Sequence, residues 1–117
     1  MRAVLLIDHG SRRDDANRVV EQVAEQLRAA HDVPIEIAHM EIAAPTIADG
    51  VAACVRAGAT QIVAVPYFLG PGRHASDDLP RLVTEAVARY PGVSAEVTSP
   101  FGADARIVAL VAERAGL

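Results

Sequence analysis

Residues 5–17, LLIDHGSRRDDAN, decide the fold, because a run of aliphatic residues ends there abruptly at a polar turn. The run begins at residue 3, and its five consecutive apolar residues, AVLLI, are typical of a strand that is covered on both faces. Residues 14–30 place their apolar side chains on one helical stripe, which predicts an amphipathic helix. This stretch is therefore a strand, a turn and a helix, with His9 at the junction.

The same alternation continues to the end of the chain. Further strands are predicted at residues 34–42, 61–65 and 93–97, and further helices at 45–57, 77–90 and 103–115. Pro45 suits the first turn of the second helix, and Ile107, Leu110 and Val111 of the last helix are expected to be buried. Four βα units predict one α/β domain over residues 1–117, with an open four-stranded parallel sheet and helices on both faces.

Composition excludes several classes of function. The chain has a net charge of −4, which argues against a nucleic-acid partner or an anionic membrane surface. The single cysteine, Cys54, excludes an internal disulfide and a multi-cysteine zinc site, and we expect it to be a core thiol. No apolar run approaches the roughly 18 residues of a membrane span. We expect a cytoplasmic protein.

Three candidate residues follow three different predicted strands. Ligands of an open parallel sheet bind outside the carboxyl ends of its strands. His9 follows the first strand, Glu41 ends the second, and His74 lies in the loop after the third. Two imidazoles suit a mid-to-late first-row divalent metal, and Glu41 would serve as a third ligand or as a proton acceptor.

Each of these residues also has an ordinary explanation. A single histidine such as His9 can pack at a turn, His74 can be an unremarkable loop residue, and Glu41 can be a solvated carboxylate. His39 lies two residues before Glu41, so we expect it to share the same strand face and to be a weaker candidate for lining the site.

Basic residues gather near the same edge. Arg12, Arg13 and Arg73 are either solvated surface charges or contacts for an anionic ligand, and guanidinium groups are suited to carboxylates. Ser11 is expected to cap the first helix, whose N-terminus would also attract anions. From the residues alone, the site is a divalent-metal site with an anionic ligand.

Three segments together resemble a known family: DHGSRRDDAN (8–17), HMEIAAPTIADGV (39–51) and VPYFLGPGRHASDDLP (65–80). HGSR alone would be a weak signal, but the three segments in this order and spacing are fairly specific and extend over nearly the whole chain. The chain resembles the class II tetrapyrrole chelatases, above all the short form of the sirohydrochlorin cobaltochelatase/ferrochelatase family.

The resemblance implies a chelatase-like half domain and a lyase activity. Members insert a divalent metal into a uroporphyrinoid such as sirohydrochlorin without ATP, in cobalamin or siroheme biosynthesis, and short members are homodimers. The metal-binding and proton-accepting histidines of the family correspond to His9 and His74, and its acidic residue corresponds to Glu41. The metal substrate is expected to be Co²⁺ before Fe²⁺ or Ni²⁺, and no nucleotide is expected.

A mechanism follows as a hypothesis. His9 and His74 would deliver the metal and take part in deprotonating the ring, with Glu41 as ligand or proton relay. The substrate contacts would be Ser11, Arg12, Arg13 and Arg73 at the carboxylate rim, with Tyr67, Phe68 and Leu69 as an apolar wall.

Two other functions stay open. The first is a metal or tetrapyrrole carrier that uses the same residues without turnover. The second is a histidine phosphatase, although that class has Arg before its histidine and this chain has Asp8. A nucleotide-binding module is disfavoured because the first turn lacks G-x-G-x-x-G.

Overall fold

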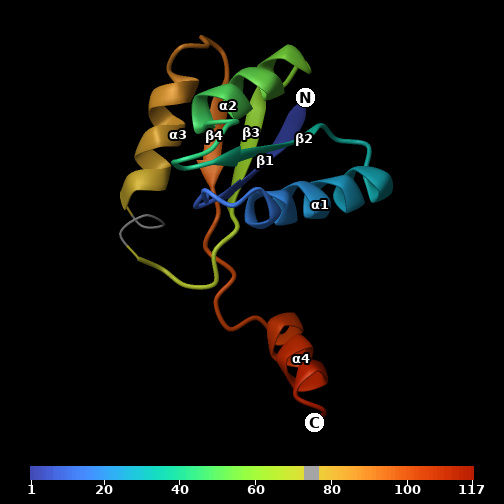
Figure 1. Cartoon of the computed structure of the whole chain (residues 1–117). Helices are drawn as coiled ribbons and strands as arrows, with labels where there is room; N and C mark the ends of the chain where they lie inside the picture. Colours follow the sequence, from blue (N-terminus) through green and yellow to red (C-terminus); the bar gives the residue numbers. More distant parts are fainter. Residues whose placement is uncertain (73–76) are drawn as a thin grey trace.

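Strands and helices alternate along the whole chain (Figure 1) in a computed structural model that describes residues 1–72 and 77–117. The elements are β1 (Arg2–Asp8), α1 (Asp14–Ala30), β2 (Ile35–His39), α2 (Ile47–Arg56), β3 (Gln61–Pro66), α3 (Leu79–Val87), β4 (Ser94–Val97) and α4 (Ala105–Arg114). The strands form one parallel sheet in the order β2-β1-β3-β4. The predicted α/β fold of four βα units is confirmed.

The central position of β1 brings the carboxyl ends of three strands together. Asp8 at the end of β1 is paired in register with His39 at the end of β2. Ile7 is paired with Pro66 at the end of β3. The turns that follow these three strands therefore share the edge of the sheet at which ligands bind.

Helices cover both faces of the sheet, as predicted. On one face, α2 and α3 pack on each other and on the strands, and one buried apolar cluster includes Leu5, Val51 and Val83. On the other face, α1 packs on β1 and β2 (Figure 1). Its side chains of Val20 and Ala24 are fully buried. These two apolar layers hold the sheet rigidly beneath the turns at its carboxyl edge.

Cys54 lies in the apolar cluster beneath α2 and is fully buried. Burial raises the pKa of its thiol to about 12, because the thiolate would lose its hydration. The prediction of a core thiol is confirmed.

The second strand is shorter than predicted. β2 ends at His39 rather than at residue 42, because the backbone turns there and Ile42 takes a left-handed φ of 75°. Glu41 consequently lies outside the strand, and the prediction that His39 and Glu41 share one strand face is wrong.

The second helix begins two residues later than predicted. Its N-cap is Thr46, whose Oγ1 accepts a hydrogen bond from the Asp49 N–H at 3.1 Å. The Asp49 carboxylate accepts one from the Thr46 N–H at 2.9 Å. This capping box starts α2 at Ile47, so the prediction that Pro45 lies in the first turn is wrong.

The last helix does not pack on the sheet, so the prediction that Ile107, Leu110 and Val111 are buried is wrong. Figure 1 shows α4 standing away from the sheet at the end of an extended segment. Two backbone hydrogen bonds, from Phe101 to Phe68 at 2.9 Å and from Gly102 to Leu69 at 2.7 Å, tie that segment to the chain after β3. They direct the chain away from the sheet.

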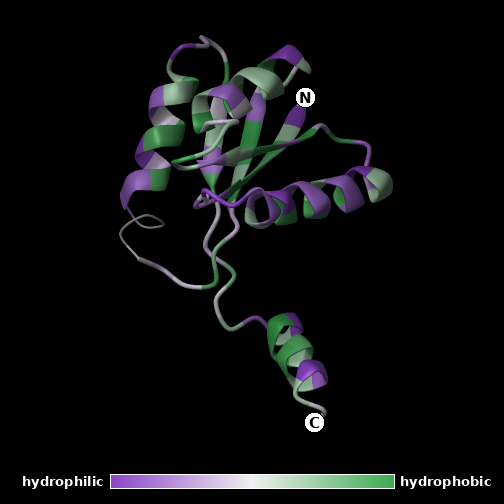
Figure 2. Cartoon of the chain, viewed as in Figure 1, coloured by the Kyte–Doolittle hydropathy of each residue, from purple (hydrophilic) through white to green (hydrophobic). Residues whose placement is uncertain are grey.

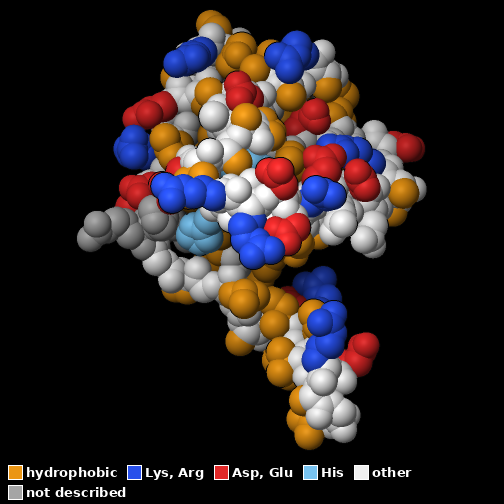
Figure 3. Space-filling view, viewed as in Figure 1, with side chains coloured by type: hydrophobic (Ala, Val, Ile, Leu, Met, Phe, Trp, Pro, Cys, Tyr) orange, Lys and Arg blue, Asp and Glu red, His pale blue; other side chains and the backbone are white. Residues whose placement is uncertain are grey.

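The consequence is an exposed apolar surface on α4. Val108, Leu110 and Val111 are 58%, 47% and 61% exposed. Figure 2 shows hydrophobic residues along this helix as well as along the strands, and Figure 3 shows apolar side chains gathered on it. Among the described residues, no helix combines the length and the apolar character that a membrane crossing requires.

Candidate functional site

His9 directly follows β1 and is exposed at the carboxyl edge of the sheet. Its imidazole stacks on the ring of Phe68, with ring centroids 4.0 Å apart and an angle of 20° between the planes. Phe68 follows β3 and is only 5% exposed, so it forms a fixed floor under the imidazole. The stacking restricts the orientation of the His9 ring while leaving the side chain at the surface.

Glu41 is brought beside His9 by the backbone. Two backbone hydrogen bonds lie beyond the paired strands, from Met40 N–H to the Asp8 carbonyl at 3.0 Å and from Glu41 N–H to the His9 carbonyl at 3.1 Å. Glu41 is exposed. Two of the three predicted metal-site residues, His9 and Glu41, therefore lie on adjacent backbone segments.

Gly10 makes this close approach of the two segments geometrically possible. It has a φ of 90°, and a Cβ atom built on it would lie 1.9 Å from the carbonyl oxygen of Glu41. No side chain fits at that distance from a backbone atom, so the position requires glycine. The glycine lets the turn after β1 pack against the chain that carries Glu41.

Below the turn, the side chains of His39 and Asp8 form a hydrogen-bonded pair that the sequence reasoning missed. His39 is 2% exposed, and its Nδ1 lies 2.5 Å from Oδ1 of Asp8. The sequence analysis assigns Asp8 no role in the site. The available signal was that a histidine and a carboxylate each end a strand of one parallel sheet, since such ends are neighbours if the strands are adjacent.

Ser11 does not cap the first helix, so that prediction is wrong. The Asn17 side chain holds the Ser11 backbone in a turn: Oδ1 accepts the Ser11 N–H and Nδ2 donates to the Ser11 carbonyl, both at 2.8 Å. The hydroxyl of Ser11 accepts the Arg13 N–H at 3.1 Å. The turn therefore continues to Arg13, and α1 begins at Asp14.

The predicted basic residues differ in their surroundings. Arg12 is exposed, whereas Arg13 forms a two-pronged ion pair with Asp15 at 3.0 and 2.8 Å. This pair lowers the pKa of Asp15. The predicted residues Arg73 and His74 lie outside the described residues.

An apolar groove of about 330 Å³ opens next to the stacked rings. Its lining residues come from the chain after β3, the extended segment and α4: Tyr67, Phe68, Leu69, Phe101, Ile107, Leu110 and Val111. Tyr67 meets Phe101 edge to face, with centroids 5.3 Å apart. The two aromatic residues predicted to contact a ligand therefore line one surface.

A complete metal site cannot be assembled from the described residues alone. Within residues 1–72 and 77–117, no three His, Cys, Asp or Glu side chains are grouped closely enough to hold a metal ion. The set of His9, Glu41 and His74 remains a prediction, because His74 lies outside those residues.

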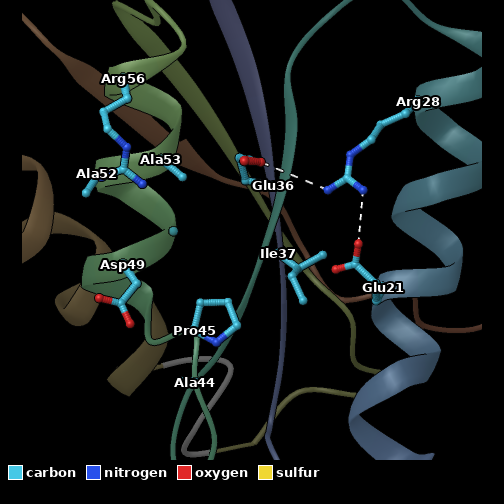
Figure 4. A pocket seen from close by; sticks show the side chains of 11 residues that line it. Glu21, Arg28, Glu36, Ile37, Ala44, Pro45, Asp49, Ala52, Ala53 and Arg56 are labelled. Carbon is cyan, nitrogen blue, oxygen red and sulfur yellow. Dashed lines mark hydrogen bonds and ion pairs between the residues drawn. The ribbon is translucent and has the colours of Figure 1, made fainter.

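A larger cavity of about 570 Å³ lies elsewhere, between α1 and α2 (Figure 4). Its charged groups compensate one another: Arg28 contacts Glu21 at 3.0 Å and Glu36 at 4.0 Å. None of the described residues predicted for the site lines this cavity. Its charges are those of a solvated groove beside the edge strand.

Comparison with known proteins places the chain in a family. A family model described as CbiX matches residues 3–116. A sirohydrochlorin ferrochelatase from Priestia megaterium is 41% identical over 116 residues, which cover 97% of this chain and 43% of that protein. A sirohydrochlorin cobaltochelatase from Methanococcus maripaludis is 32% identical over 142 residues, with 98% of each chain covered.

A solved structure agrees with these sequences. The sirohydrochlorin chelatase SirB from Bacillus subtilis subspecies spizizenii, solved in complex with cobalt, matches with a TM-score of 0.90 and 34% identity. The match covers 98% of this chain and 50% of that chain. The chain thus spans about half the length of SirB and of the ferrochelatase, and nearly all of the cobaltochelatase. Because the CbiX family model matches almost the entire sequence, this chain belongs to the CbiX family.

Proposed function

We propose that this chain is a metal chelatase that inserts a divalent metal into sirohydrochlorin or a closely related tetrapyrrole. The observation that carries the proposal is the edge of the sheet in a CbiX-family chain. His9 lies there on an aromatic floor, in backbone contact with Glu41. Relatives over nearly the whole chain are a sirohydrochlorin ferrochelatase and a sirohydrochlorin cobaltochelatase.

The reaction requires a loosely held metal and a nearby base. Uptake of one M²⁺ by the macrocycle releases two pyrrole N–H protons, so charge is conserved. His9 and His74 present the metal through neutral imidazole nitrogens and accept protons as the ring binds it. Glu41 assists as a third ligand or as the acceptor that passes protons to solvent.

The substrate is a flat ring with a carboxylate rim. The groove lined by Tyr67, Phe68 and Leu69 offers an apolar wall to the ring face. Around the rim, Ser11, Arg12, Arg13 and Arg73 provide contacts for carboxylates. Arg13 would have to exchange its ion pair with Asp15 for a substrate carboxylate.

Co²⁺ is the first choice of metal, with Fe²⁺ and Ni²⁺ as alternatives. Imidazole ligands suit all three ions. The related proteins do not single out one metal, since one is a ferrochelatase, another is a cobaltochelatase and SirB was solved with cobalt. Competition between the three ions under identical conditions therefore decides the choice.

The direct test is insertion into sirohydrochlorin with Co²⁺, Fe²⁺ and Ni²⁺ in turn. Absorbance of the tetrapyrrole should change faster with the protein than in the spontaneous reaction, in proportion to enzyme concentration. A carrier would bind metal or tetrapyrrole without accelerating the change. Binding without acceleration for all three metals would overturn the chelatase proposal in favour of that carrier.

Removal of one imidazole tests the proposed site. His9→Ala should lower kcat/KM by about 100-fold or more, because a positioned acid–base group contributes at least that much. His31→Ala is the matched control, since His31 is also an exposed histidine but lies beyond the far end of α1. Near wild-type activity in a folded His9→Ala variant would remove His9 from the mechanism.

We also propose that the protein works as a homodimer in which a second copy covers α4. Val108 and Val111 of this helix are more than half exposed, although they belong to its apolar face. Two-fold dimers are the commonest assemblies of soluble proteins, and they pair the same patch of both copies. The groove between α4 and Tyr67–Leu69 connects this surface to the site.

A further inference from the structure

The turn that carries His9 and the segment that carries Glu41 rest on one buried polar pair. His39 is the only buried residue with a polar or charged side chain in the part of the chain that the structure describes, and it is 2% exposed. Its Nδ1 lies 2.5 Å from Oδ1 of Asp8, whose side chain is 16% exposed. A carboxylate can only accept, so Nδ1 of His39 carries the proton and donates.

The pair lies directly below the proposed site. Asp8 and His39 are register partners at the ends of β1 and β2, and each is one or two residues from a proposed ligand. The next two backbone hydrogen bonds join Met40 to Asp8 and Glu41 to His9. The side-chain bond is thus continuous with the backbone bonds that set the separation of His9 and Glu41.

The packing around the pair leaves it little freedom to move. A Cβ atom built on Gly10 would lie 3.2 Å from Cβ of His39, so the turn after β1 packs closely against the base of the His39 side chain. A buried carboxylate or imidazole that loses its partner is costly, which favours one geometry of the two strand ends. His39 itself is too deeply buried to act as a ligand at the surface.

We propose that Asp8 and His39 are positioning residues: their hydrogen bond sets the separation of His9 and Glu41 and thereby the affinity of the site for metal. The inference rests on the proposed function, because it takes His9 and Glu41 as metal ligands. Groups that hold metal ligands in position raise the affinity for the metal without contacting the ion. Their loss costs about 10–100-fold in metal affinity or activity.

The test compares two amides at one position. His39→Asn can place its N–H where Nδ1 donates, whereas His39→Gln is one methylene longer and carries its N–H beyond that position. Titration of the folded proteins with Co²⁺ alone, followed by visible absorption, should give a Kd within a few-fold of wild type for His39→Asn. For His39→Gln and for His39→Leu the Kd should rise by roughly 10-fold or more.

A matched control separates positioning from stability. Ile62→Val removes one buried methylene at the opposite end of the sheet and should cost about 0.5–1.5 kcal/mol of stability. Its Tm should fall while its Kd for Co²⁺ stays at the wild-type value. If His39→Leu does not fold, the two amide variants still decide the question.

The possible outcomes distinguish this inference from the proposed function. Wild-type protein that binds no Co²⁺ would contradict the metal site itself. Wild-type protein that binds Co²⁺, together with a folded His39→Gln or His39→Leu variant of unchanged Kd, would overturn only the positioning role. An equal loss of affinity in the Asn and Gln variants would also overturn it, because the placement of the donor would then be irrelevant.

Discussion

At the end of β1, Gly10 has a left-handed backbone and leaves no room for a side chain. In the structure, the neighbour that excludes a side chain is the carbonyl oxygen of Glu41, 1.9 Å from a hypothetical Cβ atom. The residue is therefore needed by the fold of the site before any ligand binds.

Gly10→Ala should lower the free energy of unfolding by at least about 2 kcal/mol, through the strained φ and the clash with a backbone atom. Urea unfolding measures this loss. Gly70→Ala is the control, because nothing lies within 4 Å of its Cβ position and its φ is not left-handed. Equal stability of the two variants would contradict the close packing of Gly10 against Glu41.

A second prediction concerns the thiol of Cys54. Only the thiolate reacts with iodoacetamide, and with a pKa of about 12 roughly one thiol in ten thousand is ionised at pH 8. Mass spectrometry should therefore find the folded protein unmodified and the urea-unfolded protein carrying one adduct. Labelling of the folded protein at the rate of a free cysteine would show that α2 opens readily.

Sequence reasoning placed His9 and Glu41 at one edge because strand ends can be counted along the chain. It could not pair Asp8 with His39, since that contact depends on β1 and β2 being neighbours, which the order of the elements does not determine. Asn17 was missed for a similar reason. Its contact with the Ser11 backbone joins residues six apart across the turn between β1 and α1, and hydrophobic periodicity does not determine the conformation of that turn.

At the scale of elements, hydrophobic periodicity predicted all four strands and all four helices, and α1 was predicted at its observed bounds, 14–30. The ends of the other elements were less well predicted, because local hydrogen bonds decide them. At the start of α2, the pattern Thr46-x-x-Asp49 is a capping box that the sequence already contained. The prediction instead started the helix one residue before this box, at Pro45, because proline suits the first turn of a helix.

Thr46→Ala should lower the free energy of unfolding by about 1 kcal/mol, because the Asp49 N–H at the start of α2 would lose its acceptor. Thermal unfolding followed by circular dichroism measures the change. Thr84→Ala provides a comparison in the interior of α3, where the hydroxyl donates to the Pro80 carbonyl of its own helix. It should cost less, and the opposite ranking would contradict the importance of the cap.

At the scale of the molecule, α4 departs furthest from the sequence prediction. Its sequence pattern is amphipathic. Such a pattern indicates that the apolar face of the helix packs against another surface, but it does not identify that surface. The extended segment before it is bonded to the chain after β3, so α4 cannot return to the sheet of its own chain in this arrangement. Ile107, Leu110 and Val111 instead line the groove beside the proposed site, and Val108 remains exposed.

If a second copy covers α4, one added charge should separate the copies. Wild-type protein should sediment with twice the 12.3 kDa of one chain. Val108→Glu should weaken the dimer about 30-fold or more, equivalent to about 2 kcal/mol, because an unpaired carboxylate would be buried in the interface. The measurement is sedimentation equilibrium across a concentration series.

Ala109→Glu is the matched control for this experiment. It adds the same charge to the next exposed residue of α4, which lies about 100° around the helix and away from the apolar face. The control should remain dimeric wherever wild type does. A monomeric wild type, or equal weakening by both substitutions, would show that the apolar face of α4 does not serve self-association.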